Sequence, residues 1–172
     1  MSEEKLGKTK SRRKSIILLL IGLVAVVGFS VVFIGAVSGW FSSVSIALDE
    51  EYICGDECEG EFINISAAEY ENLISNEKSF IVFVDQDGCL MANMMREFVQ
   101  DYVKEKGIKS LRIMFEEMKQ TSLYDKVDFY PSVAIISKGT VVDWLKADSD
   151  EDTSAYNDYD EFRVWMDSYL GR

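Results

Sequence analysis

The apolar residues near the start of the chain form one long run that differs from every later segment. Residues 15–48 contain no charged side chain, and within them Ile16–Val37 is interrupted only by three glycines and one serine. A helix rises about 1.5 Å per residue, so about 20 apolar residues cross the hydrocarbon core of a bilayer. The pattern therefore predicts a single transmembrane helix over residues 16–38.

Beyond residue 60 the apolar residues recur in short segments whose spacing changes from one segment to the next. Continuous β-branched and aromatic runs, or strict alternation, predict strands, and a spacing of three and four residues predicts helices. The predicted strands are residues 61–66, 79–85, 110–115, 132–137 and 141–145. The predicted helices are residues 67–77, 89–106, 120–127 and 159–170. This β-α-β-α-β-α-β-β-α order predicts an α/β fold with a central mixed sheet flanked by helices.

Charge is distributed unequally on the two sides of the apolar run. Residues 1–14 carry six basic and two acidic side chains, a net charge of +4; the whole chain has −12, which leaves −16 for the remainder. Basic residues are retained on the cytoplasmic side of a membrane. We therefore predict a single-pass protein of the cell membrane, with a basic cytoplasmic tail over residues 1–15 and an extracytoplasmic C-terminal domain. A cleaved signal peptide is the alternative, although its apolar region usually spans only about 7–15 residues.

The exported part divides into a linker over residues 39–60 and a domain over residues 61–172. The linker is rich in serine and then in acidic residues, and it contains Cys54 and Cys58. Disulfides persist outside the cytoplasm, so we predict that these two cysteines pair with each other. The acidic charge would be repelled by phosphates, which argues against nucleic acid as a partner.

Two local signatures, taken with the element order, resemble the thioredoxin fold over roughly residues 61–171. In the first, the buried strand Ile81–Asp85 leads through a short loop into a helix that begins at Cys89. The second is Phe129-Tyr-Pro-Ser-Val133, directly before a strand. The resemblance implies that Cys89 is the attacking cysteine and that Pro131 is a cis-proline. It also implies that Tyr130 and Met91 contact an extended peptide substrate.

The chain departs from this thioredoxin-like pattern at the positions that complete a dithiol site. The sequence is Cys-x-x-Ala, with Ala92 in place of the second cysteine, and Phe83 stands where the family's enzymes tend to keep a buried aspartate. The chain also contains no histidine, which excludes a Cys-His dyad and leaves no recognisable metal site. The sequence therefore predicts no cofactor and does not support a self-contained dithiol oxidoreductase.

Two functions stay open at this level. A thiolate at a helix N-terminus is stabilised by the helix dipole and by free N–H groups, whereas Asp85 and Asp87 nearby would act against it. The first hypothesis is thiol-disulfide exchange through Cys89 alone, with the thiols or peptides of exported or membrane proteins as partners. Its partner thiol would come from outside or from Cys54 or Cys58. The second is a redox-inactive module, with Cys89 a small apolar residue, that binds or scaffolds another exported protein.

Overall fold

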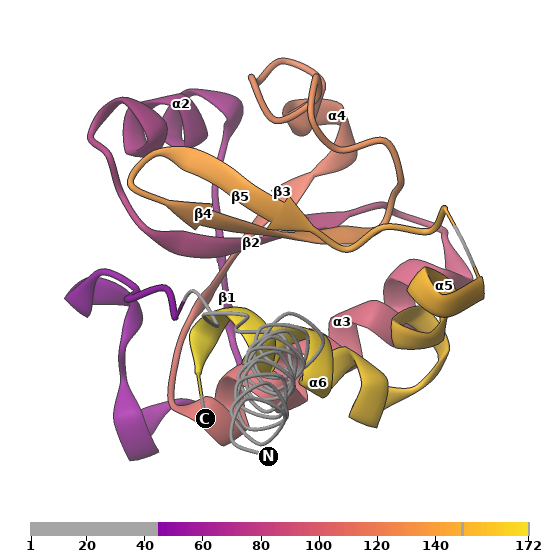
Figure 1. The fold of residues 1–172 in the computed structure, drawn as a ribbon. Coiled ribbons are helices and arrows are strands. Elements are labelled where there is room, and N and C mark those ends of the chain that lie inside the picture. The colour runs from indigo at the N-terminus through magenta and orange to yellow at the C-terminus, as the bar shows by residue number, and fades with distance from the viewer. Residues whose placement is uncertain (1–44, 149, 172) are drawn as a thin grey trace, which may run out of the picture. The chain divides into compact units, whose positions relative to one another are not determined.

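The computed structural model describes residues 45–148 and 150–171, which belong to one unit that begins at Ser43 (Figure 1). The basic tail and the transmembrane helix predicted over residues 1–38 lie outside the described residues. None of the helices within residues 45–148 and 150–171 combines the length and the apolar character needed to cross a membrane.

A five-stranded sheet forms the centre of this unit, with the strand order β1-β3-β2-β4-β5. Strands β1, β3 and β2 are parallel to one another, whereas β4 runs antiparallel to β2 and β5 runs antiparallel to β4. The predicted mixed sheet is therefore confirmed. The strands are β1 (Phe62–Asn64), β2 (Phe80–Asp85), β3 (Ser110–Met114), β4 (Ser132–Ser137) and β5 (Thr140–Trp144).

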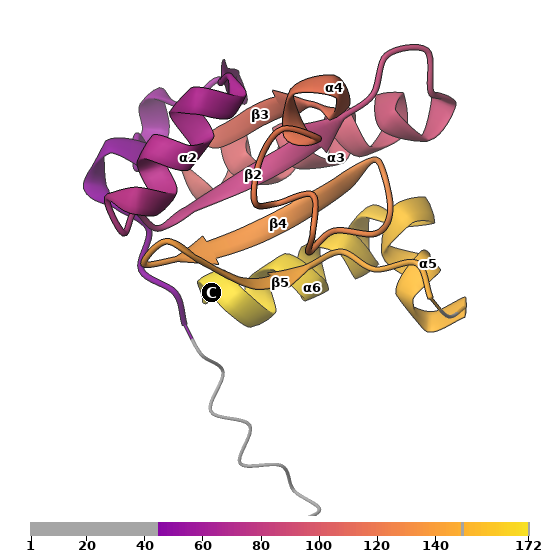
Figure 2. The same ribbon diagram turned by 90° about the horizontal axis from the view of Figure 1, so that it is seen from above.

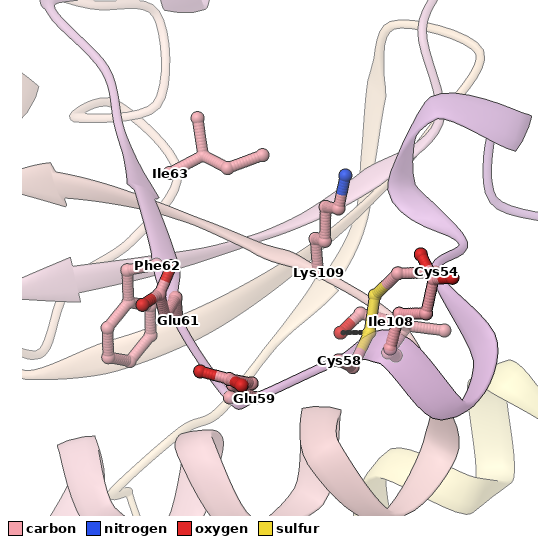
Figure 3. A pocket seen from close by; sticks show the side chains of 10 residues that line it. Cys54, Cys58, Glu59, Glu61, Phe62, Ile63, Ile108 and Lys109 are labelled. Atoms are coloured by element: carbon pink, nitrogen blue, oxygen red, sulfur yellow. Dashed lines mark hydrogen bonds between the residues drawn. A yellow bond between two sulfur atoms is a disulfide. The ribbon is translucent and has the colours of Figure 1, made fainter.

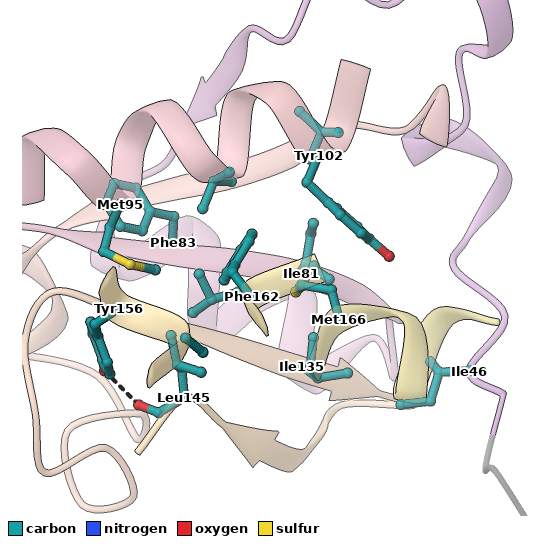
Figure 4. Packing of buried hydrophobic residues seen from close by; sticks show 14 residues of the cluster. Ile46, Ile81, Phe83, Met95, Tyr102, Ile135, Leu145, Tyr156, Phe162 and Met166 are labelled. Carbon is teal, nitrogen blue, oxygen red and sulfur yellow. Dashed lines mark hydrogen bonds between the residues drawn. The ribbon is translucent and has the colours of Figure 1, made fainter. Parts of the chain in front are cut away.

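Helices cover both faces of the sheet, as Figures 1 and 2 show. One face carries α2 (Ala67–Ser75) and α4 (Phe115–Met118), and the other carries α3 (Leu90–Lys106), α5 (Asp150–Asn157) and α6 (Tyr159–Leu170). Each face has its own apolar core, because the continuous runs in β2 and β4 send alternate side chains to opposite faces. Figure 4 shows the core under α3 and α6, in which Phe83 of β2 lies beside Met95 of α3 and Phe162 of α6.

The segment predicted to be a linker is, from residue 45 onward, part of the folded unit. Ile46 and Tyr52 are each only 5% exposed, and the Ile46 N–H donates to the Tyr169 carbonyl at 2.7 Å. Two short 3-10 helices, η1 (Glu50–Tyr52) and η2 (Gly55–Glu57), carry the chain to β1. The segment lacks the periodicity of a strand or long helix and is held by single anchor residues, which is why the sequence pattern did not show it.

The helix predicted over residues 120–127 is wrong, because this stretch forms successive turns and the helix α4 lies earlier. The Thr121 hydroxyl donates to the Met118 carbonyl at 2.7 Å and accepts from the Leu123 N–H at 3.2 Å. A side chain that takes backbone partners in this way diverts them from a helical ladder. The apolar residues Met118, Leu123 and Val127 still reach the core, so their helical spacing misidentified the local structure.

Tyr70 of α2 gives a prediction about the core on the α2 face. Its ring is fully buried, its hydroxyl has no hydrogen-bond partner among the described residues, and burial raises its pKa above the usual value. A buried hydroxyl without a partner costs about 1–3 kcal/mol. Tyr70→Phe is therefore expected to raise the free energy of unfolding by about 1 kcal/mol, measured by urea denaturation of the full chain.

Tyr102→Phe is the matched control for this substitution. The Tyr102 ring is equally buried, but its hydroxyl donates to Asp167 Oδ1 at 3.0 Å. Removal of that hydroxyl is expected to lower the free energy of unfolding by about 1 kcal/mol. The two substitutions should therefore act in opposite directions, and a loss of stability in Tyr70→Phe would contradict the prediction.

Candidate functional site

Cys89 and Pro131 lie at the same edge of the sheet. Strand β2 ends at Asp85, four residues before Cys89, and β4 begins directly after Pro131. Val84 of β2 pairs with Ser132 of the antiparallel β4, so the end of one strand and the start of the other are neighbours. The Tyr130–Pro131 peptide bond is cis, the isomer that the resemblance implies. The topology thus brings the two predicted signatures, which are about 40 residues apart in the chain, to one place.

Cys89 is the residue that precedes the first turn of α3. Its backbone is extended, its carbonyl accepts from the Asn93 N–H at 3.2 Å, and the positive φ of Gly88 (73°) turns the chain into the helix. Cys89 is half-buried and is the free cysteine among the described residues, whereas Ala92, one turn later, is fully buried. The start of α3 therefore contains one thiol, and the buried Ala92 supplies no second reacting group.

Met91 and Tyr130, the two residues predicted to contact a peptide, already make contacts within the protein. Met91 is half-buried and packs against the core under α3. The Tyr130 ring lies 4.4 Å from the Phe115 ring, and its hydroxyl donates to the Val127 carbonyl at 2.6 Å. Their sequence neighbours are more open: Leu90 is 76% exposed and Phe129 is 39% exposed. Exposed apolar side chains thus flank both Cys89 and the cis peptide bond in the chain.

Asp85 has a different environment from the one expected in the sequence analysis. It is fully buried at the end of β2, and its carboxylate is paired with two arginines. Arg96 of α3 donates from Nε at 3.0 Å and from Nη2 at 2.9 Å, while Nε of Arg112 of β3 lies 2.7 Å from Oδ2 as an ion pair. The negative charge of Asp85 is therefore balanced inside the protein by two guanidinium groups.

Arg96 and Arg112 are site residues that the sequence reasoning missed. Only one signal was present, an aspartate that closes an otherwise apolar buried strand four residues before Cys89. The two arginines come from other elements, and a single sequence does not show which element each packs against.

Cys54 and Cys58 are joined in a disulfide at the far end of α3 from Cys89. The N–H groups of Cys54 and Gly55 both donate to the carbonyl of Gly107, the residue that ends α3. A helix of the length of α3, 17 residues, spans about 25 Å. Neither cysteine can therefore reach a mixed disulfide at Cys89 within one molecule, which overturns the alternative that one of them is its resolving partner.

The disulfide lines a cavity of about 340 Å³ next to β1, shown in Figure 3. Three exposed glutamates, Glu57, Glu59 and Glu61, lie around it together with Ile108 and Lys109. Closure of so short a loop stabilises the fold by about 2 kcal/mol in the chain-entropy model. Because this cavity is adjacent to the end of α3 opposite Cys89, it does not belong to the candidate site.

Comparisons with known proteins agree with the architecture. No family model and no curated protein matches the sequence. The structure is similar to a mutant thioredoxin from Halobacterium salinarum, with a TM-score of 0.51 and 15% sequence identity over 69% of this chain and 98% of that chain. A thioredoxin from Trypanosoma brucei brucei gives a TM-score of 0.47 and 10% identity over 63% of this chain and 93% of that chain. At such identities the likeness concerns the fold and not the chemistry. The described part of the chain therefore has a thioredoxin-like fold.

Proposed function

We propose that this chain is a membrane-anchored, extracytoplasmic protein that carries out thiol-disulfide exchange through Cys89 alone. One observation supports this most directly: a free, half-buried cysteine directly precedes α3, the longest of the described helices, at the sheet edge that also holds the cis Tyr130–Pro131 bond. The other two cysteines are already paired at the opposite end of that helix. Cys89 is thus the only thiol of the chain that is free to exchange.

The reaction consists of two exchange steps. In the first, the Cys89 thiolate attacks one sulfur of a disulfide in a partner protein, so a bond forms to Cys89 and the partner's own S–S bond breaks. The leaving sulfur departs as a thiolate and takes up a proton. In the second, a thiol from outside this chain attacks the mixed disulfide and regenerates the Cys89 thiolate. The outside thiol is required because Ala92 occupies the position from which a second cysteine would act.

The membrane placement is supported by the sequence and by the disulfide. The apolar run over residues 16–38 follows a basic tail and precedes an acidic domain, as in proteins whose N-terminus stays in the cytoplasm. A Cys54–Cys58 disulfide suits an oxidising compartment outside the cytoplasm. An anchored domain of this kind would meet the thiols of exported and membrane proteins and not those of the cytoplasm.

A second candidate function is a redox-inactive module that binds an exported polypeptide. The exposed apolar side chains of Leu90 and Phe129 favour it, because they offer contact area that does not depend on the sulfur. In that case Cys89 could be replaced by serine without loss of partner binding.

The test is to trap mixed disulfides of the full chain by acid quenching and to resolve them without reductant. The wild type is expected to form adducts with exported proteins that a reductant releases, and Cys89→Ser is expected to form none. The Cys54→Ser, Cys58→Ser double variant is the matched control and should keep the adducts. Absence of adducts in the wild type would disprove exchange, and partner binding that survives Cys89→Ser would support the binding module instead.

A further inference from the structure

The first turn of α3 lacks the side-chain cap that the neighbouring helices have. Helix α2 begins with a capping box, in which the Glu69 N–H donates to the Ser66 hydroxyl at 3.3 Å and the Ser66 N–H donates to the Glu69 carboxylate at 2.8 Å. Helix α6 begins at Asp158, whose carboxylate accepts two N–H groups. Cys89 makes no such bond to α3, and the first turn of α3 contains no acidic residue. An uncapped first turn frays more readily than a capped one.

A chain of side-chain and backbone hydrogen bonds connects this uncapped turn to the buried end of β2. The Asp85 carboxylate, fixed in the interior, accepts three bonds from the Arg96 guanidinium at 2.9–3.0 Å. The same guanidinium donates from Nη1 to Asn93 Oδ1 at 2.9 Å. The backbone N–H of Asn93 in turn donates to the Cys89 carbonyl at 3.2 Å, as the first i to i−4 bond of the helix. Strand β2 is thereby linked, through Arg96 and Asn93, to the residue that carries the thiol.

We propose that Asp85, Arg96 and Asn93 are positioning residues for Cys89, and that they hold the first turn of α3 in place of a cap. The inference rests on the proposed exchange function and identifies what orients its sulfur. An ordered first turn keeps the free N–H groups directed at the site of the thiolate, which is where helix-terminal stabilisation acts. The buried Asp85 and the planar fork of Arg96 suit this role, because a guanidinium can bind two oxygen acceptors at fixed angles.

Asn93→Ala tests the link without disturbing the buried ion pair. Asn93 is exposed, so its removal is expected to leave the chain folded, with a shift of the unfolding midpoint no larger than loss of one cap produces. The rate at which Cys89 reacts with an aromatic disulfide reagent should fall by up to about fivefold, the change in the equilibrium constant of the first turn that loss of one cap produces. Because Cys54 and Cys58 are paired, the coloured thiolate released by the full chain reports Cys89 alone.

Arg96 variants separate charge from orientation. Arg96→Gln is expected to slow the reaction about tenfold, since both the link and the balancing charge are lost. Arg96→Lys keeps the charge but cannot bind Asp85 and Asn93 in the fork geometry, so an intermediate rate is expected. Amide hydrogen exchange at Asn93 and Met94 should be faster in Arg96→Gln than in the wild type, because the first turn opens more often.

Gln100→Ala is the matched control, since it removes another amide side chain from α3, one that no described bond connects to Asp85 or Cys89. Its reaction rate and its hydrogen exchange at residues 93–94 should equal those of the wild type. Equal Cys89 rates in Asn93→Ala and the wild type would overturn the positioning role. That result would not affect the proposed exchange function, which the trapping of partner adducts tests separately. If the variants showed the expected reagent rates but the wild type formed no partner adducts, only the exchange function would be disproved.

Discussion

Replacement of Asp85 by asparagine is expected to lower the free energy of unfolding by about 3 kcal/mol. The Asp85 side chain is completely buried, and its charge is the only described partner of the Arg112 guanidinium and the main partner of Arg96. Removal of one member of a buried ion pair typically costs about 3–5 kcal/mol, because the remaining charge is left without compensation. The lower figure applies here, since the side chains of Arg96 and Arg112 are 27% and 24% exposed and gain some hydration. Urea denaturation of the full chain measures the change.

Asp160→Asn is the control for this experiment. Asp160 also pairs with an arginine, Arg163, but its side chain is 81% exposed and the two residues are three apart on α6. Exposed pairs of this kind contribute about 0–1 kcal/mol. Addition of Arg112→Met to Asp85→Asn should restore part of the lost stability, because it removes an unpaired charge. Similar losses of free energy of unfolding in Asp85→Asn and Asp160→Asn would show that the buried ion pairs of Asp85 contribute no more than an exposed pair.

The elements that the sequence predicted well are those whose own pattern decides their structure. Strands β2 and β4 are continuous apolar runs, which only a sheet covered on both faces accommodates. Helix α6 was predicted at its observed bounds, since its apolar residues keep helical spacing; in the structure Asp158 caps its start. The predicted helix end at residue 106 and the predicted break between the strands 132–137 and 141–145 fall at Gly107 and Gly139, which both have a positive φ that glycine adopts without strain.

The elements that the sequence did not predict depend on contacts between distant residues. Residues 45–58 are ordered by a few anchors, such as the Lys109 N–H that donates to the Tyr52 carbonyl at 2.8 Å. A Cβ on Gly107 would lie 2.8 Å from the Gly55 backbone, so this segment packs on the end of α3 through two glycines. Neither glycine contributes to a hydrophobic pattern, and their contact exists only once the fold has formed.

The candidate site, like the fold, was predicted from the sequence only where a local pattern determines it. The place of Cys89 at a helix start and of Pro131 before a strand followed from local patterns. The compensation of Asp85 by Arg96 and Arg112 required the order of the strands and the face of α3, which no local pattern contains. The separation of Cys89 from the disulfide likewise depends on which end of α3 the segment over residues 45–58 contacts, and no local pattern shows that contact.

Phe162→Ala is expected to be the most destabilising of the substitutions considered, with a loss of about 3–5 kcal/mol. Phe162 of α6 is fully buried in the core that Figure 4 shows together with Tyr102 of α3. Its ring centroid lies 6.0 Å from that of Tyr102 and 6.0 Å from that of Phe98, which is also on α3. The substitution removes the apolar contact area of the ring and leaves a cavity between the two helices. Domains of ordinary stability unfold with about 5–15 kcal/mol, so this loss is a large fraction of the total.

Val164→Ala provides the comparison on the same helix, two residues later. Val164 is 63% exposed, so its truncation is expected to change the free energy of unfolding by less than about 0.5 kcal/mol. Urea denaturation of the two variants of the full chain should therefore separate them clearly, and a loss below about 1 kcal/mol in Phe162→Ala would contradict the packing. Phe162 packs α6 against α3, the helix that follows Cys89. Its truncation should therefore also slow the reaction of the Cys89 thiol, whereas Val164→Ala should not.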